Sequence, residues 1–392
     1  MSDPLLILGA STRAAASSAI RAGLSPLTAD LFCDDDLRQM LEETRRVSNY
    51  PSDLPNLARG CPPSAWMFTG CLENHPRIID AIAAERVLWG TPAGSIQRVR
   101  DPWQLSQRLH HCGLPCPQVL QADQREMIGR RSRSHWIRKP YRSAGGGNMQ
   151  LLSACRNVSQ ETDSSSTQHD NVSAYYLQHV VDGQSQSAVF VAAHGAAVLL
   201  GVTRQLIGAS WTGATGFRYA GSIGPLQPSA VHVSQWRTIG DGLASGFDLC
   251  GLFGVDAIVN DHGIWAIEVN PRYTSSIEVL EFGLEFHAVT DHVVACRDGR
   301  LNDRSPAAQA RFRGKAIIYA GRDVRIDEAF VRAARQANAE QSWPVVADIP
   351  TAAQTIAAGH PVATVFASSD RLADVEPRLR DAAQSWRTKW ML

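Results

Sequence analysis

The stretch that most constrains this sequence is residues 256–272, in which two short apolar segments flank the polar turn 261–263. This pattern predicts a β-hairpin. Glu268 and Asn270 lie two residues apart, so their side chains point to the same face of the second strand. Asp256 belongs to the first strand and can lie opposite them.

Two carboxylates and an amide on one face form a site for a hard cation, the kind that holds Mg²⁺ (or Mn²⁺) together with nucleotide phosphates. We therefore predict Asp256, Glu268 and Asn270 as metal ligands. Arg272 follows on the same side and can bind an anion there. The alternative is an ordinary hairpin with polar edge residues.

A second phosphate-binding signal lies upstream, where the predicted strand 136–140 carries Lys139 and is followed by Gly145, Gly146 and Gly147. A lysine can neutralise a polyphosphate, and a glycine loop can close its backbone amides over it. The pattern is not a Walker loop, because the lysine precedes the glycines. The alternative is a flexible surface hairpin.

Residues 4–33 predict a β-α-β start, with a glycine turn after the first strand and Asp30 at the tip of the second. This arrangement resembles a dinucleotide-binding unit, but only Gly9 of the Gly-x-Gly-x-x-Gly pattern is present. The unit is therefore either a nicotinamide dinucleotide site or a Rossmann-like fold without one. Arg13, in the first helical turn, is either a ligand of a substrate anion or a solvated surface arginine.

Five further polar side chains lie where strands end or helices begin, which is where α/β proteins bind polar substrates. We predict substrate contacts for Glu73 and Asn74 after the strand 66–70, for Ser275 and Ser276 at a helix start, and for Arg218 at a glycine-rich strand edge. Helix capping is the alternative for Asn74 and for the two serines.

The composition restricts partners and compartment. The 392 residues are too many for one ordinary core, so two or three domains are expected. Lys and Arg together number 38, as do Asp and Glu, which argues against nucleic acid and membrane partners. No apolar run approaches a membrane span, and we identify no signal peptide. The 8 cysteines lack zinc-site spacing and indicate free thiols in a cytoplasmic protein.

The spacing Asp-x11-Glu-x-Asn-Pro-Arg resembles the metal-binding hairpin of the ATP-grasp superfamily, in the form most similar to carbamoyl-phosphate synthetase and biotin carboxylase. The motif order over residues 4–370 resembles the branch of predicted ATP-dependent carboligases. The resemblance implies an α/β fold, α+β in the nucleotide half. It further implies a Rossmann-like domain at 1–112, an ATP-grasp domain at 113–302 and a small β-rich C-terminal module at 303–392.

Within the ATP-grasp domain, the resemblance implies a lid subdomain at 113–180. Residues 156–173 within it are rich in serine and poor in apolar residues, which predicts a flexible loop. Backbone groups of Gln178, His179 and Val180 would bind adenine. Asp101-Pro102 stands where the family has an Asp-Lys or Asp-Arg pair, so either Arg100 or Arg98 is expected to serve as the missing phosphate cation. Catalytic roles are expected for Lys139, Arg272 and Arg204, the last either at a strand end near the phosphates or as a surface arginine.

The family uses ATP and Mg²⁺ to convert a carboxylate into an acyl phosphate, which an amine then attacks. We therefore expect an ADP-forming carboxylate–amine ligase with small-molecule substrates, and a homodimer is one expected assembly. An alternative is a carboxylase that activates bicarbonate. Alternatives of other classes are an NAD(P)-dependent oxidoreductase and a non-catalytic ATP-binding protein, since the family's acids near residues 179–185 are absent.

Overall fold

The computed structural model describes residues 3–153, 175–302 and 311–392, so the predicted flexible loop 156–173 lies outside the described residues. The N-terminal unit is a parallel four-stranded sheet of order β3-β2-β1-β4. Leu5, Leu6, Ile7 and Leu8 are all fully buried, as expected for a central parallel strand covered on both faces. The elements are β1 (Pro4–Gly9), α1 (Arg13–Arg21), β2 (Ser25–Asp30), α2 (Asp35–Met40), β3 (Thr44–Arg46), α3 (Leu54–Arg59), β4 (Ala65–Phe68), η1 (Leu72–Asn74) and α4 (Pro76–Ala83).

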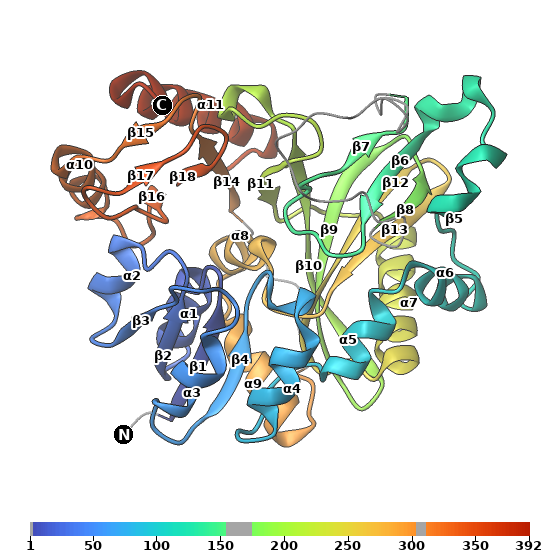
Figure 1. Cartoon of the computed structure of the whole chain (residues 1–392), viewed down its shortest axis with the longest axis horizontal. Coiled ribbons are helices and arrows are strands. Elements are labelled where there is room, and N and C mark those ends of the chain that lie inside the picture. The colour runs from blue at the N-terminus through green and yellow to red at the C-terminus, as the bar shows by residue number, and fades with distance from the viewer. Residues whose placement is uncertain (1–2, 154–174, 303–310) are drawn as a thin grey trace.

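Two helices connect this sheet to a small antiparallel sheet of order β5-β8-β6-β7 (Figure 1). β6 carries the predicted lysine, and Lys139 pairs with Tyr176 of β8. The elements are α5 (Ala93–Val99), α6 (Pro102–His111), β5 (Val119–Gln121), η2 (Ala122–Met127), η3 (Arg130–His135), β6 (Trp136–Pro140), β7 (Gln150–Leu151) and β8 (Tyr175–His179). The side chain of Asp101 caps α6 by accepting hydrogen bonds from the amides of Trp103 and Gln104.

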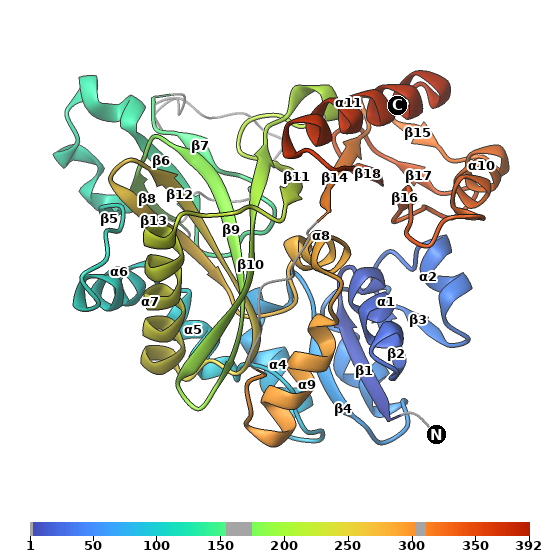
Figure 2. The same cartoon turned by 180° about the vertical axis from the view of Figure 1, so that it is seen from behind.

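The large sheet has the order β13-β12-β9-β10-β11-β14-β18-β16, and its neighbouring strands are antiparallel (Figures 1 and 2). Its first five strands come from residues before 302 and its last three from residues after 311. The elements are β9 (Gln184–Ala193), β10 (Ala196–Ile207), η6 (Ser210–Thr212), β11 (Tyr219–Gly224), α7 (Ala230–Phe247), β12 (Gly251–Asn260), β13 (Gly263–Asn270), α8 (Ser275–Leu284) and α9 (Ala288–Asp298).

The C-terminal residues complete this sheet and add two helices, of which α11 packs against β14 and β18. The elements are β14 (Phe312–Tyr319), β15 (Val324–Arg325), α10 (Glu328–Asn338), β16 (Val346–Ala347), β17 (Thr355–Ile356), β18 (Pro361–Ser369) and α11 (Leu372–Trp390). The sheet thus continues through the proposed boundary between residues 302 and 303. A membrane-crossing helix, which needs length and low polarity together, does not occur among the residues that the structure describes.

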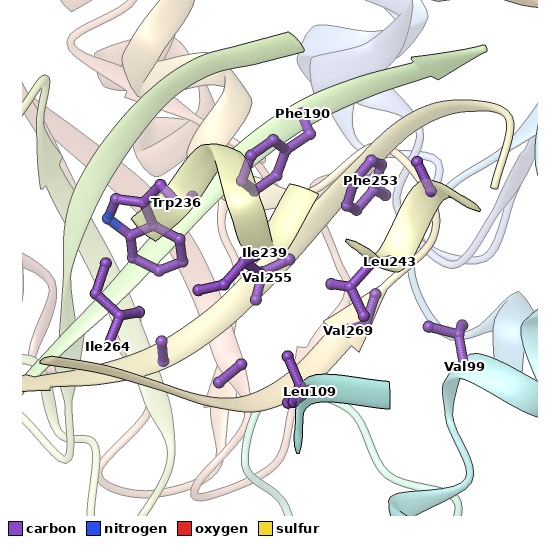
Figure 3. Packing of buried hydrophobic residues seen from close by; sticks show 14 of the residues in the cluster. Val99, Leu109, Phe190, Trp236, Ile239, Leu243, Phe253, Val255, Ile264 and Val269 are labelled. Carbon is purple, nitrogen blue, oxygen red and sulfur yellow. The ribbon is translucent and has the colours of Figure 1, made fainter. Parts of the chain in front are cut away.

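A hydrophobic core between α7 and the strands β9, β12 and β13 supports the hairpin from behind (Figure 3). Phe190 stacks on Phe253 with ring centroids 5.0 Å apart, and Trp236 of α7 packs beside Phe190. In β12, Val255 and Ala257 belong to this core, so the residue between them, Asp256, points to the opposite face.

Candidate active site

A cavity of about 400 Å³ lies where the small sheet, the glycine loop and the large sheet meet. Its lining comes from four separate segments of the chain, within residues 137–149, 178–187, 205–219 and 256–276. Of the predicted site residues, its lining includes Lys139, Gly145, Gly146, Gln178, His179, Val180, Asp256, Glu268, Asn270, Arg272, Ser275 and Ser276.

The hairpin places its two carboxylates directly opposite each other, because Asp256 pairs with Glu268 across β12 and β13. A β-bulge between this pair and the next one, Ala257 with Ala266, gives β13 one extra residue, Ile267. Ala266 packs in the core behind the hairpin, and in a regular strand Glu268, two residues later, would share its face. The bulge turns Glu268 toward the cavity instead.

The Asp256 carboxylate accepts one hydrogen bond from the Gln205 side chain (3.0 Å) and one from the Asn270 side chain (3.1 Å). Burial and the nearby charge of Glu268 raise the pKa of Asp256 to about 6. These two carboxylates therefore repel each other in the protein alone, and a divalent cation would relieve the repulsion.

The donor set fits magnesium, which takes carboxylate and amide oxygens. No group of three His, Cys, Asp or Glu side chains suited to a metal occurs in the described part of the chain, so the third protein ligand would be the amide of Asn270. The Asn270 Oδ1 atom accepts a hydrogen bond from Arg272 Nη2 (3.2 Å), which fixes the orientation of the amide.

Lys139 is 4% exposed, and its Nζ atom donates to Gln178 Oε1 (3.1 Å) and to the Ile267 carbonyl (3.2 Å). Burial acts to lower the pKa of Lys139, but Tyr176 and the carboxylates Glu268 and Asp256 outweigh it, and the pKa lies above its ordinary value. The lysine therefore stays cationic beside the two carboxylates, where it can neutralise phosphate oxygens.

The glycine loop requires glycine at two positions. Gly145 and Gly146 have φ angles of 60° and 75°, and a Cβ on Gly146 would lie 1.9 Å from the Phe217 carbonyl oxygen. The Gly145 carbonyl accepts a hydrogen bond from the Tyr219 amide (2.9 Å), which ties the loop to β11. Gly147 shows neither feature and is not part of the cavity lining.

The connection after β8 differs from the expected adenine contact. The His179 amide donates to the Gln118 carbonyl (2.9 Å), and the Val180 amide donates to the His135 carbonyl (2.7 Å). These two donors are therefore already used within the protein. Val181, the next residue, also lines the cavity, and its amide has no hydrogen-bond partner among the described residues. Sequence reasoning missed this residue.

Arg272 is held by Glu73 of the N-terminal unit and by its own neighbours in the chain. Its Nε atom donates to Glu73 Oε1 (2.8 Å), and its Nη1 atom donates to the Tyr273 carbonyl (3.0 Å). Arg100 lies 3.5 Å from the same Glu73 oxygen and donates to the Asn74 side chain (2.9 Å). Glu73 and Asn74 therefore orient cations rather than line the cavity. Arg100 does not line the cavity either. It lines a smaller adjacent cavity of about 30 Å³, and Lys139, Gln178 and Glu268 line both cavities.

The structure places three predicted arginines elsewhere. Arg204 pairs with Glu376 of α11 (2.7 Å). Its neighbour in the strand, Gln205, faces Asp256, and because successive strand residues point to opposite faces, Arg204 points away from the cavity. Arg13 is buried against Glu278 and Asp348. Arg218 donates to the Gly359 carbonyl, and its guanidinium lies 5.0 Å from the centre of the Tyr319 ring.

The start of α8 contributes hydroxyl groups to the cavity. Ser276 is buried and bonds through Oγ to Thr203 (3.0 Å) and Ser222 (3.2 Å), whereas Ser275 lines the cavity with no side-chain hydrogen bond among the described residues. The Thr274 Oγ1 atom is buried without a partner among the described residues and also lines the cavity. These hydroxyls can receive a polar substrate atom.

The side chain of Asp30, at the end of β2, is fully hydrogen-bonded within the N-terminal unit. The Asp30 carboxylate accepts hydrogen bonds from the Thr12 hydroxyl (2.8 Å) and from the amides of Thr12, Phe32 and Cys33, and Asp30 is 1% exposed. It therefore cannot accept the ribose hydroxyl that the dinucleotide interpretation requires.

The comparisons with known proteins agree with this geometry. Residues 99–276 match the ATP-grasp domain family. A search of curated proteins finds no match. Among solved structures, an N5-carboxyaminoimidazole ribonucleotide synthetase in complex with ADP is 12% identical, with a TM-score of 0.68 over 100% of this chain and 98% of the other.

Two further structures show the same fold. The biotin carboxylase domain of a 2-oxoglutarate carboxylase from Hydrogenobacter thermophilus, a dimer in complex with MgADP, ADP and bicarbonate, is 12% identical (TM-score 0.69; 96% of this chain, 89% of the other). An L-amino acid ligase from Bacillus licheniformis is 15% identical (TM-score 0.67; 97% of each chain). The expected ATP-grasp fold is thus confirmed, and residues 99–276 belong to the ATP-grasp domain family.

Proposed function

We propose that this protein is an ADP-forming ligase that activates a small carboxylate as an acyl phosphate and joins the acyl group to an amine. The observation that carries the proposal is that Lys139, the facing carboxylates Asp256 and Glu268, and Arg272 line one cavity. Transfer of a phosphoryl group to a carboxylate requires cationic side chains and a pair of acids that can bind a metal ion.

Each group of cavity residues has its own proposed role. Lys139 neutralises phosphate oxygens of ATP, and the loop of Gly145 and Gly146 covers them with backbone amides. Asp256, Glu268 and Asn270 would hold Mg²⁺ or Mn²⁺, which when bound screens the phosphate charge from the incoming carboxylate. The Val181 amide would contact the nucleotide base in place of the amides of His179 and Val180, which are already used within the protein.

Arg272 is proposed to bind the transferring phosphoryl group. A carboxylate oxygen attacks the γ-phosphorus, the bond to ADP breaks and an acyl phosphate forms. The amine nitrogen then attacks the acyl carbon, loses its proton, and inorganic phosphate leaves. Glu73 and Asn270 fix the guanidinium of Arg272, so its charge is oriented before the substrate arrives.

The test measures ADP release across a panel of carboxylates and amines, with hydroxylamine added in a parallel series to trap acyl phosphates as hydroxamates. We expect ADP release to require one carboxylate and one amine, and hydroxamate to form with the carboxylate alone. The inactive control is Lys139→Met, which removes the phosphate cation but keeps an unbranched side chain.

A bicarbonate-activating carboxylase is the second candidate, favoured by the likeness to the biotin carboxylase domain whose structure contains bicarbonate. Repeating the panel with and without bicarbonate separates the two, because bicarbonate-dependent ADP release with no amine requirement would overturn the ligase proposal. ATP binding without turnover on any substrate would instead indicate a non-catalytic protein. The dimer named for that same relative makes a homodimer our proposed assembly.

A further inference from the structure

A second cavity, of about 470 Å³, lies between the N-terminal sheet and the C-terminal residues. It shares no lining residue with the cavity that contains Lys139. Its lining includes the apolar side chains of Phe32, Ile317 and Ile356 and the two carboxylates of Asp34 and Asp348. We call it the acidic cavity. Its volume is in the range of small-molecule binding sites.

Hydrogen bonds between residues near the two ends of the chain hold the walls of the acidic cavity together. The Asp36 carboxylate accepts hydrogen bonds from the amides of Asp348 (2.9 Å) and Ile349 (3.0 Å). The Asp35 amide donates to the Ile349 carbonyl (2.7 Å), and Arg335 holds the Asp35 carboxylate through two hydrogen bonds. Figure 1 shows α2 beside the β16 and β17 region accordingly. The cavity is therefore preformed.

Asp34 is the unusual member of this wall. It occupies the N-cap position of α2, but its side chain makes no capping hydrogen bond. It is 8% exposed, and its carboxylate has no hydrogen-bond or ion-pair partner in the described part of the chain. Burial raises the pKa of Asp34 well above its ordinary value, and the negative charges of Asp348, Asp36 and Asp30 add to this effect. A buried acid without a partner is costly unless a ligand supplies one.

The neighbouring cations make no direct pair with Asp34, and the charge of Arg13 only partly offsets the rise in the pKa of Asp34. Arg13 donates through Nε to Asp348 (2.8 Å) and through its two Nη atoms to Glu278, so its donors are directed elsewhere. Lys315 pairs with Glu278 as well (3.0 Å). Both cations are thus paired with other carboxylates, and of the acids in this cluster Asp34 and Asp348 line the cavity.

We propose that the acidic cavity binds a small organic cation, namely a protonated amine carried on an apolar body. Asp34 and Asp348 receive the ammonium group, and Phe32, Ile317 and Ile356 pack against the body of the ligand. An ammonium group beside carboxylates stays protonated and has no lone pair for attack on an acyl carbon. The bound ammonium is therefore recognised without reacting, and the site is separate from the ligase chemistry proposed above.

The test uses the full-length protein and isothermal titration calorimetry with benzylammonium as the probe. Benzyl alcohol and benzoate, which have the same ring with no charge or a negative charge, are the comparison ligands. We expect benzylammonium to bind at least about tenfold more tightly than either, because hydrogen bonds between charged groups are stronger than those between neutral ones. The variant Asp34→Asn should weaken benzylammonium binding by about tenfold or more, and Asp34→Glu should restore most of it.

The matched control is Asp80→Asn, which removes the same charge from an exposed position on α4 and should leave the probe's affinity unchanged. Mg-ATP affinity should be the same in Asp34→Asn and wild type, so failure here is distinguishable from failure of the ligase proposal. Equal binding of benzylammonium and benzyl alcohol to the wild-type protein, or no binding of benzylammonium, would overturn the inference without any variant. So would unchanged affinity in Asp34→Asn.

Discussion

Two buried carboxylates in this fold have opposite electrostatic settings. At Glu278, burial acts to raise the pKa, but Arg13 and Lys315 outweigh it and lower the pKa to about 2. At Asp256, burial and Glu268 raise the pKa to about 6, since the nearest oppositely charged groups only partly compensate them. The first carboxylate is satisfied by the protein and joins its units together. The second is not, and it lies where a ligand would complete it.

The largest effect that tests this comparison is expected for Glu278→Gln. The substitution leaves Lys315 buried without its partner and weakens the support of Arg13, so we expect a loss of about 3–5 kcal/mol in the free energy of unfolding. Urea denaturation measures this loss. The matched control Glu340→Gln, at an exposed position, should stay within about 0.5 kcal/mol of wild type. A change in Glu278→Gln as small as the control's would show that the pair does not hold the units together.

Glu268→Gln should affect activity instead of stability. Removing one of the two facing carboxylates is expected to lower ADP formation by at least about 100-fold, because it weakens the charge arrangement that screens the phosphates. The melting temperature of the metal-free protein should stay equal or rise, since the repulsion with Asp256 disappears. A fall in melting temperature as large as that of Glu278→Gln would contradict the distinction between the two clusters.

The two carboxylates should also give opposite pH dependences in metal-free protein. The folded-state pKa of Asp256 is raised, so its stabilising contribution is present at low pH and is lost as the pH rises from about 4 through about 6. The folded-state pKa of Glu278 is lowered, so its contribution is present above about 4.5 and is lost as the pH falls toward 2.

Unfolding free energies of wild type and Asp256→Asn, measured with a chelator between pH 5 and pH 8, test the first of these signs. The advantage of Asp256→Asn over wild type should grow as the pH rises, and added Mg²⁺ should restore the wild type at the upper end but not the variant. A difference between the two proteins that is independent of pH would mean that Asp256 has an ordinary pKa.

The smallest effect is expected for Arg204→Gln. Its ion pair with Glu376 is partly exposed and should contribute no more than about 1 kcal/mol to stability. ADP formation should remain within about twofold of wild type. If ADP formation fell as far as in Glu268→Gln, the side chain would reach the phosphates during turnover, as the sequence-based prediction holds.

Strand periodicity was sufficient to predict much of the hairpin. The same-face placement of Glu268 and Asn270 and the opposed Asp256 follow from alternation, and the structure has the same arrangement. The bulge at Ile267 could not be predicted, because no glycine or proline marks it and the core residues behind β13 select it. Periodicity also contains a signal that was missed, since Gln205 and not Arg204 lies on the face that contacts Asp256.

Long-range partners explain the remaining differences. Glu73 and Arg272 are separated by 199 residues, and Arg13 and Glu278 by 265, so no local pattern indicates that they pair. Arg13 and Arg272, which the sequence suggests as anion ligands, are therefore held by carboxylates that are distant in the sequence. The reverse holds for the acidic cavity, whose two carboxylates come from residues 34 and 348 and have no sequence motif in common.

The unbroken large sheet has a practical consequence for anyone who shortens this protein. β14 hydrogen-bonds to β11 on one side and to β18 on the other. A chain that ends near residue 302 would leave the amides and carbonyls of β11 bare, and such an edge recruits other strands and causes aggregation. The tail after that residue therefore cannot be trimmed away or exchanged as a cassette without also supplying a substitute neighbour for β11.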